Sequence, residues 1–522
     1  MKILTSISRR EFIRLIGVGA GALVLSSCNN TPTPTKDALT TTQALTSGED
    51  VVLNLIASPT TIQLRPGDAT RIWQYQGQIL QGSSSSLQVI PESFLGPIIR
   101  LTRGQNLKLH FKNQIPDDSI IHWHGMHVPD QSDGHPRFAI SEGQTYDYEY
   151  PILNRAGTYW YHPHPHGRTG PQVYYGMAGL LIISDDEEAK LGLPSGEFDL
   201  PLVIQDRTFD NQNQLVYVPD TMNGFFGNQV MVNGQSQHTW QVQPRPYRLR
   251  LLNGSNARIY KLAWEDDTLL NVIATDGGLL VKSVQRKYLT LAPGERVELW
   301  VNFNSYQPGQ KIRLKSLPFK VSSGTMMGGM MGNNSGLPNG EAMEILAFEV
   351  VKKTSDQSPN LPDLLSKPGF YLEKDAINRL SPRQITLSMQ MTNGTLNGRS
   401  FVMDQVANDE NVQLGDLEVW EFYNSEKGGM GMMGGGGHPH PMHIHGVQFQ
   451  VLNRQIDKQN LQEYETINEG FVNDGWKDTM LVWPGERVRV LVRFDNYTGL
   501  YLYHCHNLEH EDGGMMRNYR IH

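Results

Sequence analysis

Cysteine is the scarcest informative residue in this chain. Only Cys28 and Cys505 occur among 522 residues, in unrelated sequence contexts, so we expect no disulfide and a fold stabilised by packing. Lysine and arginine form no long run and the net charge is −8, which argues against nucleic acid as a partner. The apolar stretch 15–25 is too short for a bilayer-spanning helix, which needs about 20 residues.

Helical periodicity is also scarce. From Val51 onwards, apolar and polar residues alternate in short runs that are separated by many of the 51 glycines and 29 prolines. Alternation of this kind predicts strands, so we expect an all-β protein. A chain of 522 residues is too long for one hydrophobic core and predicts about three domains.

The first fifty residues predict export. Arg9 and Arg10 precede the apolar stretch 15–25, a pattern typical of a twin-arginine signal. The sequence Leu25-Ser26-Ser27-Cys28 resembles a bacterial lipobox, so we expect a lipid anchor on Cys28; ordinary cleavage near the serines is the alternative. We assign 1–28 to the signal and 29–50 to a Thr/Pro-rich linker, and we expect a periplasmic or cell-surface monomer with no other membrane attachment.

The rest of the chain contains a repeat. His122-Trp123-His124-Gly125 matches His443-Ile444-His445-Gly446, and 156–164 match 498–506. A third similarity relates 291–299 to 482–490, which share Pro-Gly-Glu-Arg-Val. We therefore infer three related β-domains, with histidine pairs in the first and third only, over 51–186, 187–353 and 370–522.

The histidines are concentrated in the repeated segments. Of 17 histidines, 14 lie within 122–135, 162–166, 438–445 and 504–510. A single His-x-His pair is commonly a surface pair, but four pairs in repeated positions indicate a shared task. If domains one and three pack about a pseudo-twofold axis, eight imidazoles converge, which suits three coppers with bridging oxygen ligands. Zinc prefers about four ligands and has no redox chemistry, so copper is the favoured metal.

A second metal site is predicted around Cys505. On a strand, Cys505 points away from the face to which its neighbours His504 and His506 point. A thiolate, imidazoles and a weakly bound methionine are the ligands of an electron-transfer copper. Cys505, His510 and Met515 supply three of these ligands, and His440 can supply the fourth. Domain one has Pro163 where domain three has Cys505, so only one such site is expected.

In order and spacing, the four histidine blocks resemble the copper motifs of the multicopper oxidases, over the chain from about residue 50 to its end. The resemblance is greatest to the bacterial three-domain branch, which comprises copper-efflux oxidases and bacterial laccases. It implies three cupredoxin-like Greek-key β-barrels, four copper ions and O₂ as co-substrate. It also implies the ligands: His440, Cys505, His510 and Met515 for type 1 copper; His122 and His443 for type 2; and His124, His162, His164, His445, His504 and His506 for the type 3 pair.

The resemblance further implies how electrons and protons move. Electrons enter at type 1, pass through the Cys505 backbone, and reduce O₂ to two waters at the histidine cluster. Glu511 matches the family's proton-donating acid and Asp133 the acid beside type 2 copper; for each, a solvated loop carboxylate is the alternative. Met515 stands where high-potential laccases carry an apolar residue, so a low type 1 potential is expected. Four further histidines are expected at the rim: His127, His135, His166 and His438.

Two glycine-rich segments bear on the substrate. Thioethers select Cu(I), which favours oxidation of cuprous ion and a role in copper tolerance. Both segments are short, and loops of this kind would equally admit phenols or aromatic amines, so a laccase without a copper-detoxifying role remains open. A non-catalytic copper-binding protein and a two-domain nitrite reductase are less consistent with the full histidine set. The methionines are Met326, Met327, Met330 and Met331 in the first segment and Met430, Met432 and Met433 in the second.

Overall fold

The computed structural model describes residues 49–236, 239–321, 336–351, 360–390, 393–425 and 437–522. The Arg9-Arg10 pair, Cys28 and both methionine-rich segments lie outside these residues. Strands dominate the described chain, and its α-helices have six residues or fewer. This confirms the all-β prediction. The four helices are α2 (Thr169–Tyr174), α3 (Asp186–Ala189), α5 (Leu461–Tyr464) and α6 (Leu508–Asp512).

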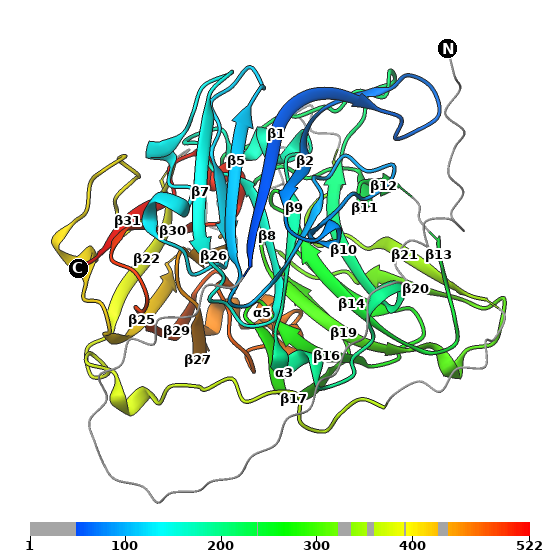
Figure 1. The fold of residues 1–522 in the computed structure, drawn as a ribbon. Helices are drawn as coiled ribbons and strands as arrows, with labels where there is room; N and C mark the ends of the chain where they lie inside the picture. Colours follow the sequence, from blue (N-terminus) through cyan, green and yellow to red (C-terminus); the bar gives the residue numbers. More distant parts are fainter. Residues whose placement is uncertain (1–48, 237–238, 322–335, 352–359, 391–392, 426–436) are drawn as a thin grey trace, which may run out of the picture.

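Two sheets form the first part of the described chain, drawn blue to cyan in Figure 1. Alternate residues of the first strand, such as Val51, Leu53 and Leu55, are buried between the two sheets, as expected for a strand with one core-facing side. The four-stranded sheet has the order β2 (Thr70–Gln81), β1 (Asp50–Ile62), β5 (Asn106–Asn113), β7 (Thr145–Pro151). The five-stranded sheet has the order β3 (Leu87–Gln88), β4 (Ile98–Thr102), β9 (Gly179–Ser184), β8 (Gly157–Pro163), β6 (Ile121–His124).

The middle part has a seven-stranded and a five-stranded sheet around its own apolar core. The larger sheet has the order β12 (Gln235–Ser236), β11 (Gln229–Val232), β10 (Asp199–Arg207), β14 (Pro246–Asn253), β19 (Arg296–Asn302), β16 (Leu270–Thr275), β17 (Gly278–Arg286). The smaller has the order β13 (Thr239–Val242), β21 (Met343–Val350), β20 (Lys311–Ser316), β15 (Tyr260–Trp264), β18 (Leu289–Leu291).

The last part, yellow to red in Figure 1, again has two sheets around a separate core. One has the order β23 (Asn393–Leu396), β22 (Arg383–Gln390), β25 (Leu417–Asn424), β29 (Glu486–Arg493), β27 (Phe449–Ile456). The other has the order β24 (Asn411–Val412), β31 (Met516–Ile521), β30 (Gly499–Cys505), β26 (His440–Ile444), β28 (Thr479–Val482).

The same strand pairings occur in all three parts. The parallel pairs β1–β5, β10–β14 and β22–β25 are each followed by an antiparallel partner, β7, β19 and β29. In the second sheets, β4–β9, β13–β21 and β24–β31 are likewise parallel. The repeat seen in the sequence is therefore a repeat of topology, although the middle copy carries no histidine pair.

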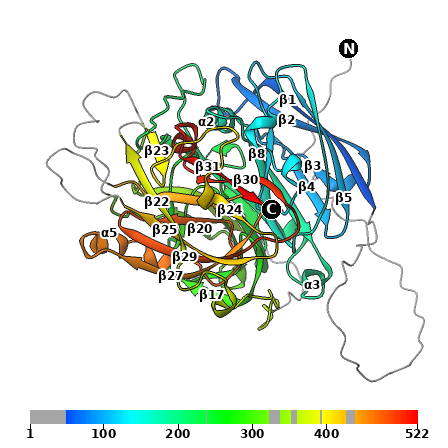
Figure 2. The ribbon, with the colours of Figure 1, turned by 90° about the vertical axis from the view of Figure 1, so that its left-hand side faces the viewer.

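The first and last parts meet at the histidines near the ends of β8 and β30. Figures 1 and 2 show the first part, in blue to cyan, beside the last part, in yellow to red. Residues from both sides form the interface, including His164 of the segment after β8, whose Nε2 lies 3.4 Å from Nε2 of His504. None of the described helices is long and apolar enough to cross a bilayer.

Candidate metal centres

Each histidine pair begins at the end of a strand, and the strands pair in the same way in both copies. In the first part, β6 carries His122 opposite His162 of β8. In the last part, β26 carries His443 opposite His504 of β30. The structure thus places equivalent residues of the repeat in equivalent registers, and it brings all eight histidines together, each at most 1% exposed.

The two halves of the cluster are related by reciprocal stacking. The His122 ring stacks on His445 at a centroid distance of 3.7 Å, and His124 stacks on His443 at the same distance. The first histidine of each pair therefore packs on the second histidine of the other pair. This exchange is what a pseudo-twofold axis between the two parts produces.

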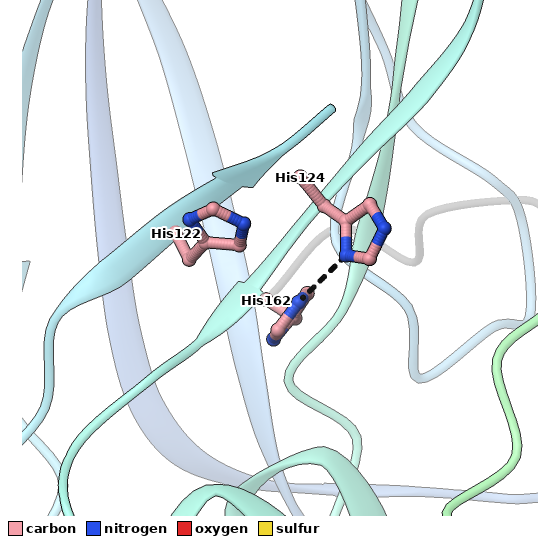
Figure 3. Close-up of side chains that lie close together, drawn as sticks. All are labelled: His122, His124 and His162. Carbon is pink, nitrogen blue, oxygen red and sulfur yellow. Dashed lines mark hydrogen bonds between the residues drawn. The ribbon is translucent and has the colours of Figure 1, made fainter. Parts of the chain in front are cut away.

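Ring nitrogens point toward one another at the centre of the cluster. Nε2 of His122 lies 3.3 Å from Nε2 of His443, and Nε2 of His445 lies 3.0 Å from Nε2 of His504. Figure 3 shows His122, His124 and His162, with the 3.4 Å contact between Nδ1 of His124 and Nε2 of His162. Three histidine triads have ligand nitrogens close enough to share one ion: His122, His124 and His162; His122, His443 and His445; and His164, His445 and His504.

The donor arrangement fits a cation. The Nδ1–H groups of His122 and His443 donate to the backbone oxygens of Asp133 and Asp478, at 2.6 and 2.7 Å. Burial lowers the pKa of both imidazoles well below the usual value, so the rings are neutral. With the proton on Nδ1, each Nε2 presents a lone pair to the other, and a metal ion between them removes the repulsion.

Two buried carboxylates border the cluster, as predicted. Asp133 accepts a hydrogen bond from Nδ1 of His445 at 2.8 Å, and burial together with nearby Asp130 raises the pKa of its carboxyl well above the usual value. Both carboxylates are at most 2% exposed, so the alternative of solvated loop acids does not apply.

Glu511 lies between histidines of both halves. Its two oxygens are 3.4 Å from Nε2 of His164 and 3.2 Å from Nδ1 of His504. Burial opposes ionisation of the Glu511 carboxyl, but these imidazoles outweigh it and hold the pKa below its usual value. Each acid therefore contacts cluster histidines directly.

The second site forms around Cys505, which is fully buried at the end of β30. Its Sγ lies 3.4 Å from Nδ1 of His440 and 3.5 Å from Nδ1 of His510, and these two nitrogens are 3.2 Å apart. The three atoms are close enough to bind one ion. In the first part, Pro163 occupies the register position of Cys505, opposite Ile121 where the last part has Met442.

Helix α6 fixes the remaining ligands of this site. The Asn507 side chain caps the helix by accepting hydrogen bonds from the backbone N–H groups of Glu509 and His510, at 3.2 and 3.3 Å. After the helix, the chain turns back toward Cys505: the Met515 N–H donates to the backbone oxygen of His510, and the Cys505 N–H donates to the backbone oxygen of Met515. Met515 is fully buried in the same core cluster as Cys505.

The middle part covers the outer edge of this site. Nε2 of His510 lies 3.0 Å from the backbone oxygen of Met222, and Asn256 O accepts from Leu508 N–H. A surface pocket lies beside α6 and is lined by residues that include Tyr217, Thr221 and Glu509. This cover could not be predicted from the sequence, because the segment around Met222 contains no motif.

The four additional histidines lie around the two sites without joining them. Nε2 of His135 donates a hydrogen bond to Asn518 Oδ1, 2.8 Å away, and the His166 ring centroid lies 5.0 Å from that of Phe401. His438 lies 6.1 Å from the His510 ring. The backbone of His127 donates to Asn154 Oδ1. Their positions agree with the expected rim.

Asp478 and Thr479 also contact the cluster, and the sequence did not reveal them. Oδ1 of Asp478 and Oγ1 of Thr479 lie 3.0 and 2.9 Å from Nε2 of His124. Only strand pairing makes them neighbours of the cluster, since β28 places Thr479 opposite His443. A lone aspartate outside the histidine blocks gives no signal of its own in one sequence.

Comparisons with known proteins agree with this geometry. Two family models, both described as multicopper oxidase, match residues 72–188 and 378–522. A laccase of Bacillus stratosphericus is 31% identical over 505 residues, covering 86% of this chain and 90% of the laccase. The crystal structure of the McoA multicopper oxidase from Aquifex aeolicus is similar with a TM-score of 0.73 and 35% identity, over 91% of this chain and 96% of McoA.

A structure whose title describes a metallo-oxidase is also similar. This multicopper oxidase from Campylobacter jejuni has a TM-score of 0.70 and 25% identity, over 92% of each chain. The structural neighbours also bear out the expectation of cupredoxin-like β-domains.

Proposed function

The chain belongs to the multicopper oxidase family, and we propose that it holds four copper ions in the two centres described above. The observation that carries the proposal is the eight-histidine cluster joined through one strand to a cysteine-centred site. When bound, copper supplies one-electron oxidation of a reductant at the cysteine site and four-electron reduction of O₂ to two waters at the cluster.

We propose the assignment of ligands that the resemblance to the multicopper oxidases implies, and several distances support it. We assign His440, Cys505, His510 and Met515 to type 1 copper, because the first three have ligand atoms within 3.5 Å of one another. His122 and His443, whose Nε2 atoms face each other, are assigned to type 2. The type 3 pair is assigned His124, His162 and His506, with the His506 ring 4.9 and 5.3 Å from the other two rings, and His164, His445 and His504, whose nitrogens converge.

The chain connects the two centres covalently. Cys505 lies between His504 and His506, so the connection from its sulfur to either imidazole consists of its own backbone and one adjacent residue. Burial of all three residues excludes water from this connection. A short, buried, covalent path of this kind suits electron transfer from the cysteine site, where the reductant is oxidised, to the histidine cluster, where O₂ is reduced.

Asp133 and Glu511 are proposed to deliver the protons that oxygen reduction consumes. Asp133 reaches both halves of the cluster, through its backbone oxygen to His122 and its carboxylate to His445. Glu511 reaches His164 and His504. The raised pKa of Asp133 suits a carboxyl that holds a proton ready to donate, whereas the lowered pKa of Glu511 suits a carboxylate that accepts a proton and passes it on among the histidines.

Cuprous ion is proposed as a substrate, in addition to laccase-type phenols and aromatic amines. Soft thioethers in the two methionine-rich segments favour Cu(I), and a neighbour of known structure is titled a metallo-oxidase. The covered His510 edge also favours a small donor over a bulky one. We further propose export by the twin-arginine route, with Cys28 as lipid attachment point, and a role in copper tolerance.

The substrate proposal is tested with matched variants. One variant carries leucine at all seven loop methionines, which removes the thioethers and preserves loop length. Turnover of Cu(I) and of a substituted phenol is then compared with the parent protein. Selective loss of Cu(I) turnover supports the proposal. Unchanged Cu(I) turnover with altered phenol turnover assigns the chain to laccase activity alone.

A further inference from the structure

His124 is oriented differently from the other cluster histidines that have an outer hydrogen bond. The rings of His122, His162, His443, His445 and His504 each place Nδ1 near an oxygen outside the cluster. In His124, Nε2 faces outward to Asp478, and Nδ1 faces inward to His162. One histidine in the cluster is therefore reversed, and some feature of the protein must select this orientation.

Asp478 is the residue that contacts the outward nitrogen of His124. A carboxylate only accepts hydrogen bonds, so it selects the ring form with the proton on Nε2 and leaves the Nδ1 lone pair directed into the cluster. The backbone oxygen of the same residue accepts from Nδ1 of His443, on which His124 stacks. Asp478 thus orients both rings of one stacked pair, one through its side chain and the other through its backbone.

Arg296 holds Asp478 in place. Its NH1 and NH2 groups donate to Oδ1 and Oδ2 of Asp478, each at 2.6 Å, in a bidentate pair with both side chains fully buried. The remaining guanidinium hydrogens go to the backbone oxygens of Thr158, Gly294 and Asp276. Since every direction of the fork has an acceptor, the guanidinium cannot turn without leaving buried groups unpaired.

Arg296 belongs to the middle part, which supplies no cluster histidine. It begins β19, immediately after the turn in which a Cβ on Gly294 would lie 3.1 Å from His506 and 3.2 Å from His124. Two buried ion pairs brace the turn, since Lys477 pairs with Asp276 and with Glu295 at 3.0 Å each. The middle part therefore forms a wall of the cluster.

The repeat provides an internal comparison for Arg296. Arg487 occupies the same position in the Pro-Gly-Glu-Arg-Val motif of the last part, and the two glutamates, Glu295 and Glu486, make the same turn contact to the backbone N–H three residues earlier. The Arg487 side chain, however, is 38% exposed and lies 3.6 Å from Glu421. The motif explains the turn in both copies, but it does not explain the buried bidentate pair in the middle copy.

We infer that Arg296 and Asp478 are positioning residues that hold the reversed ring of His124 for copper binding, so that the middle part sets the geometry of a cluster to which it gives no ligand. The inference rests on the proposed function, because it takes His124 as a copper ligand. Neither residue is expected to touch O₂ or the reductant.

The test compares Arg296→Met, Arg296→Lys and Arg487→Met with the parent holoprotein. Copper per chain, the near-ultraviolet absorption of the coupled copper pair and the chelator concentration that releases cluster copper are measured, with blue absorption as the internal control. Loss of an outer partner weakens metal binding by about 10–100-fold, so Arg296→Met should release cluster copper at correspondingly lower chelator concentration and keep its blue colour. Arg296→Lys keeps the positive charge but not the bidentate guanidinium, so it should retain part of the cluster copper binding that Arg296→Met loses. Arg487→Met should match the parent protein.

Two results overturn the inference. One is an Arg296→Met protein with the parent's chelator titration and near-ultraviolet band. The other covers the case in which that variant does not fold: Asp478→Asn preserves the side-chain shape, and parental copper retention in it contradicts the inference equally. Failure of the proposed function looks different, since the parent protein itself would then lack the coupled-pair absorption.

Discussion

The Cys505 thiol and the His504 imidazole leave opposite faces of β30. Sγ of Cys505 lies 3.4 Å from Nδ1 of His440, whereas Nε2 of His504 lies 3.0 Å from Nε2 of His445. One peptide bond thus separates the two centres along the chain. The partner strand repeats the arrangement, with Met442 opposite Cys505 and His443 opposite His504.

Glu511→Gln should slow the oxygen half-reaction. Glutamine keeps the shape beside His164 and His504 but cannot take up and release a proton, and positioned acids and bases contribute about 10²–10⁴-fold to rate. Reoxidation of the anaerobically reduced protein by O₂ should slow by a factor in that range, with blue absorption retained. Glu509→Gln is the control, because Glu509 is equally buried but bonds to Tyr217, Asn256 and Phe225 N–H. Equal reoxidation rates in the two variants would contradict the proton role.

Met515→Leu should raise the reduction potential of the type 1 site. Leucine has similar volume and fits a fully buried position, but it removes the weak thioether ligand. A redox titration of the blue absorption measures the change. An unchanged or lower potential would show that the Met515 sulfur does not tune the metal.

The effect of the close approach of Gly294 to the cluster can be measured separately from the effect of its left-handed backbone conformation. Gly294 and Gly309 have nearly the same φ, +84° and +87°, but only Gly294 faces His506 and His124, while a Cβ on Gly309 meets nothing within 4 Å. Alanine at either position should cost about 1–2 kcal/mol of folding free energy from the left-handed backbone. Only Gly294→Ala should also reduce cluster copper and oxygen consumption, measured by metal analysis and an oxygen electrode. Equal copper content in both variants would be inconsistent with a wall at Gly294.

A buried ion network joins the first and middle parts. Glu298 accepts from Thr158 Oγ1 at 2.7 Å, Arg248 Nε at 2.7 Å and Arg250 NH1 at 2.8 Å, and it is fully buried. Glu298→Gln leaves two buried guanidiniums short of a counter-charge, so a loss of about 3–5 kcal/mol is expected from the urea unfolding transition. The exposed pair of Lys311 and Glu349, 3.8 Å apart, provides the control: Glu349→Gln should change stability by less than about 1 kcal/mol. If Glu298→Gln also changed the free energy of unfolding by less than about 1 kcal/mol, the network would contribute little to stability.

The proposed copper ligands could be picked out from the sequence because each one lies in a repeated or closely spaced block. Strand alternation alone assigns Cys505 and His504 to different faces, and the register observed in β30 agrees. The exchange of stacking partners between His122 and His445 also follows from a pseudo-twofold packing of two copies.

Contacts between the three parts could not be predicted in this way. Arg296 is 182 residues from Asp478, and the same motif places Arg487 at a half-exposed position, so the motif does not distinguish the two roles. The carbonyl of Met222 over His510 depends on how the middle part packs on α6. Such relationships are set by the burial of whole sheets, which a local pattern does not encode.

The most direct test of the account is the optical spectrum and oxygen consumption of copper-loaded Cys505→Ser. Serine is close in size to cysteine, so the substitution should leave the eight cluster histidines in place. None of them belongs to the group that Cys505 forms with His440 and His510. The account predicts a colourless protein that retains the coupled-pair absorption of the cluster and consumes no oxygen with any reductant. A Cys505→Ser protein that remained blue, or that still turned over at the parental rate, would contradict it.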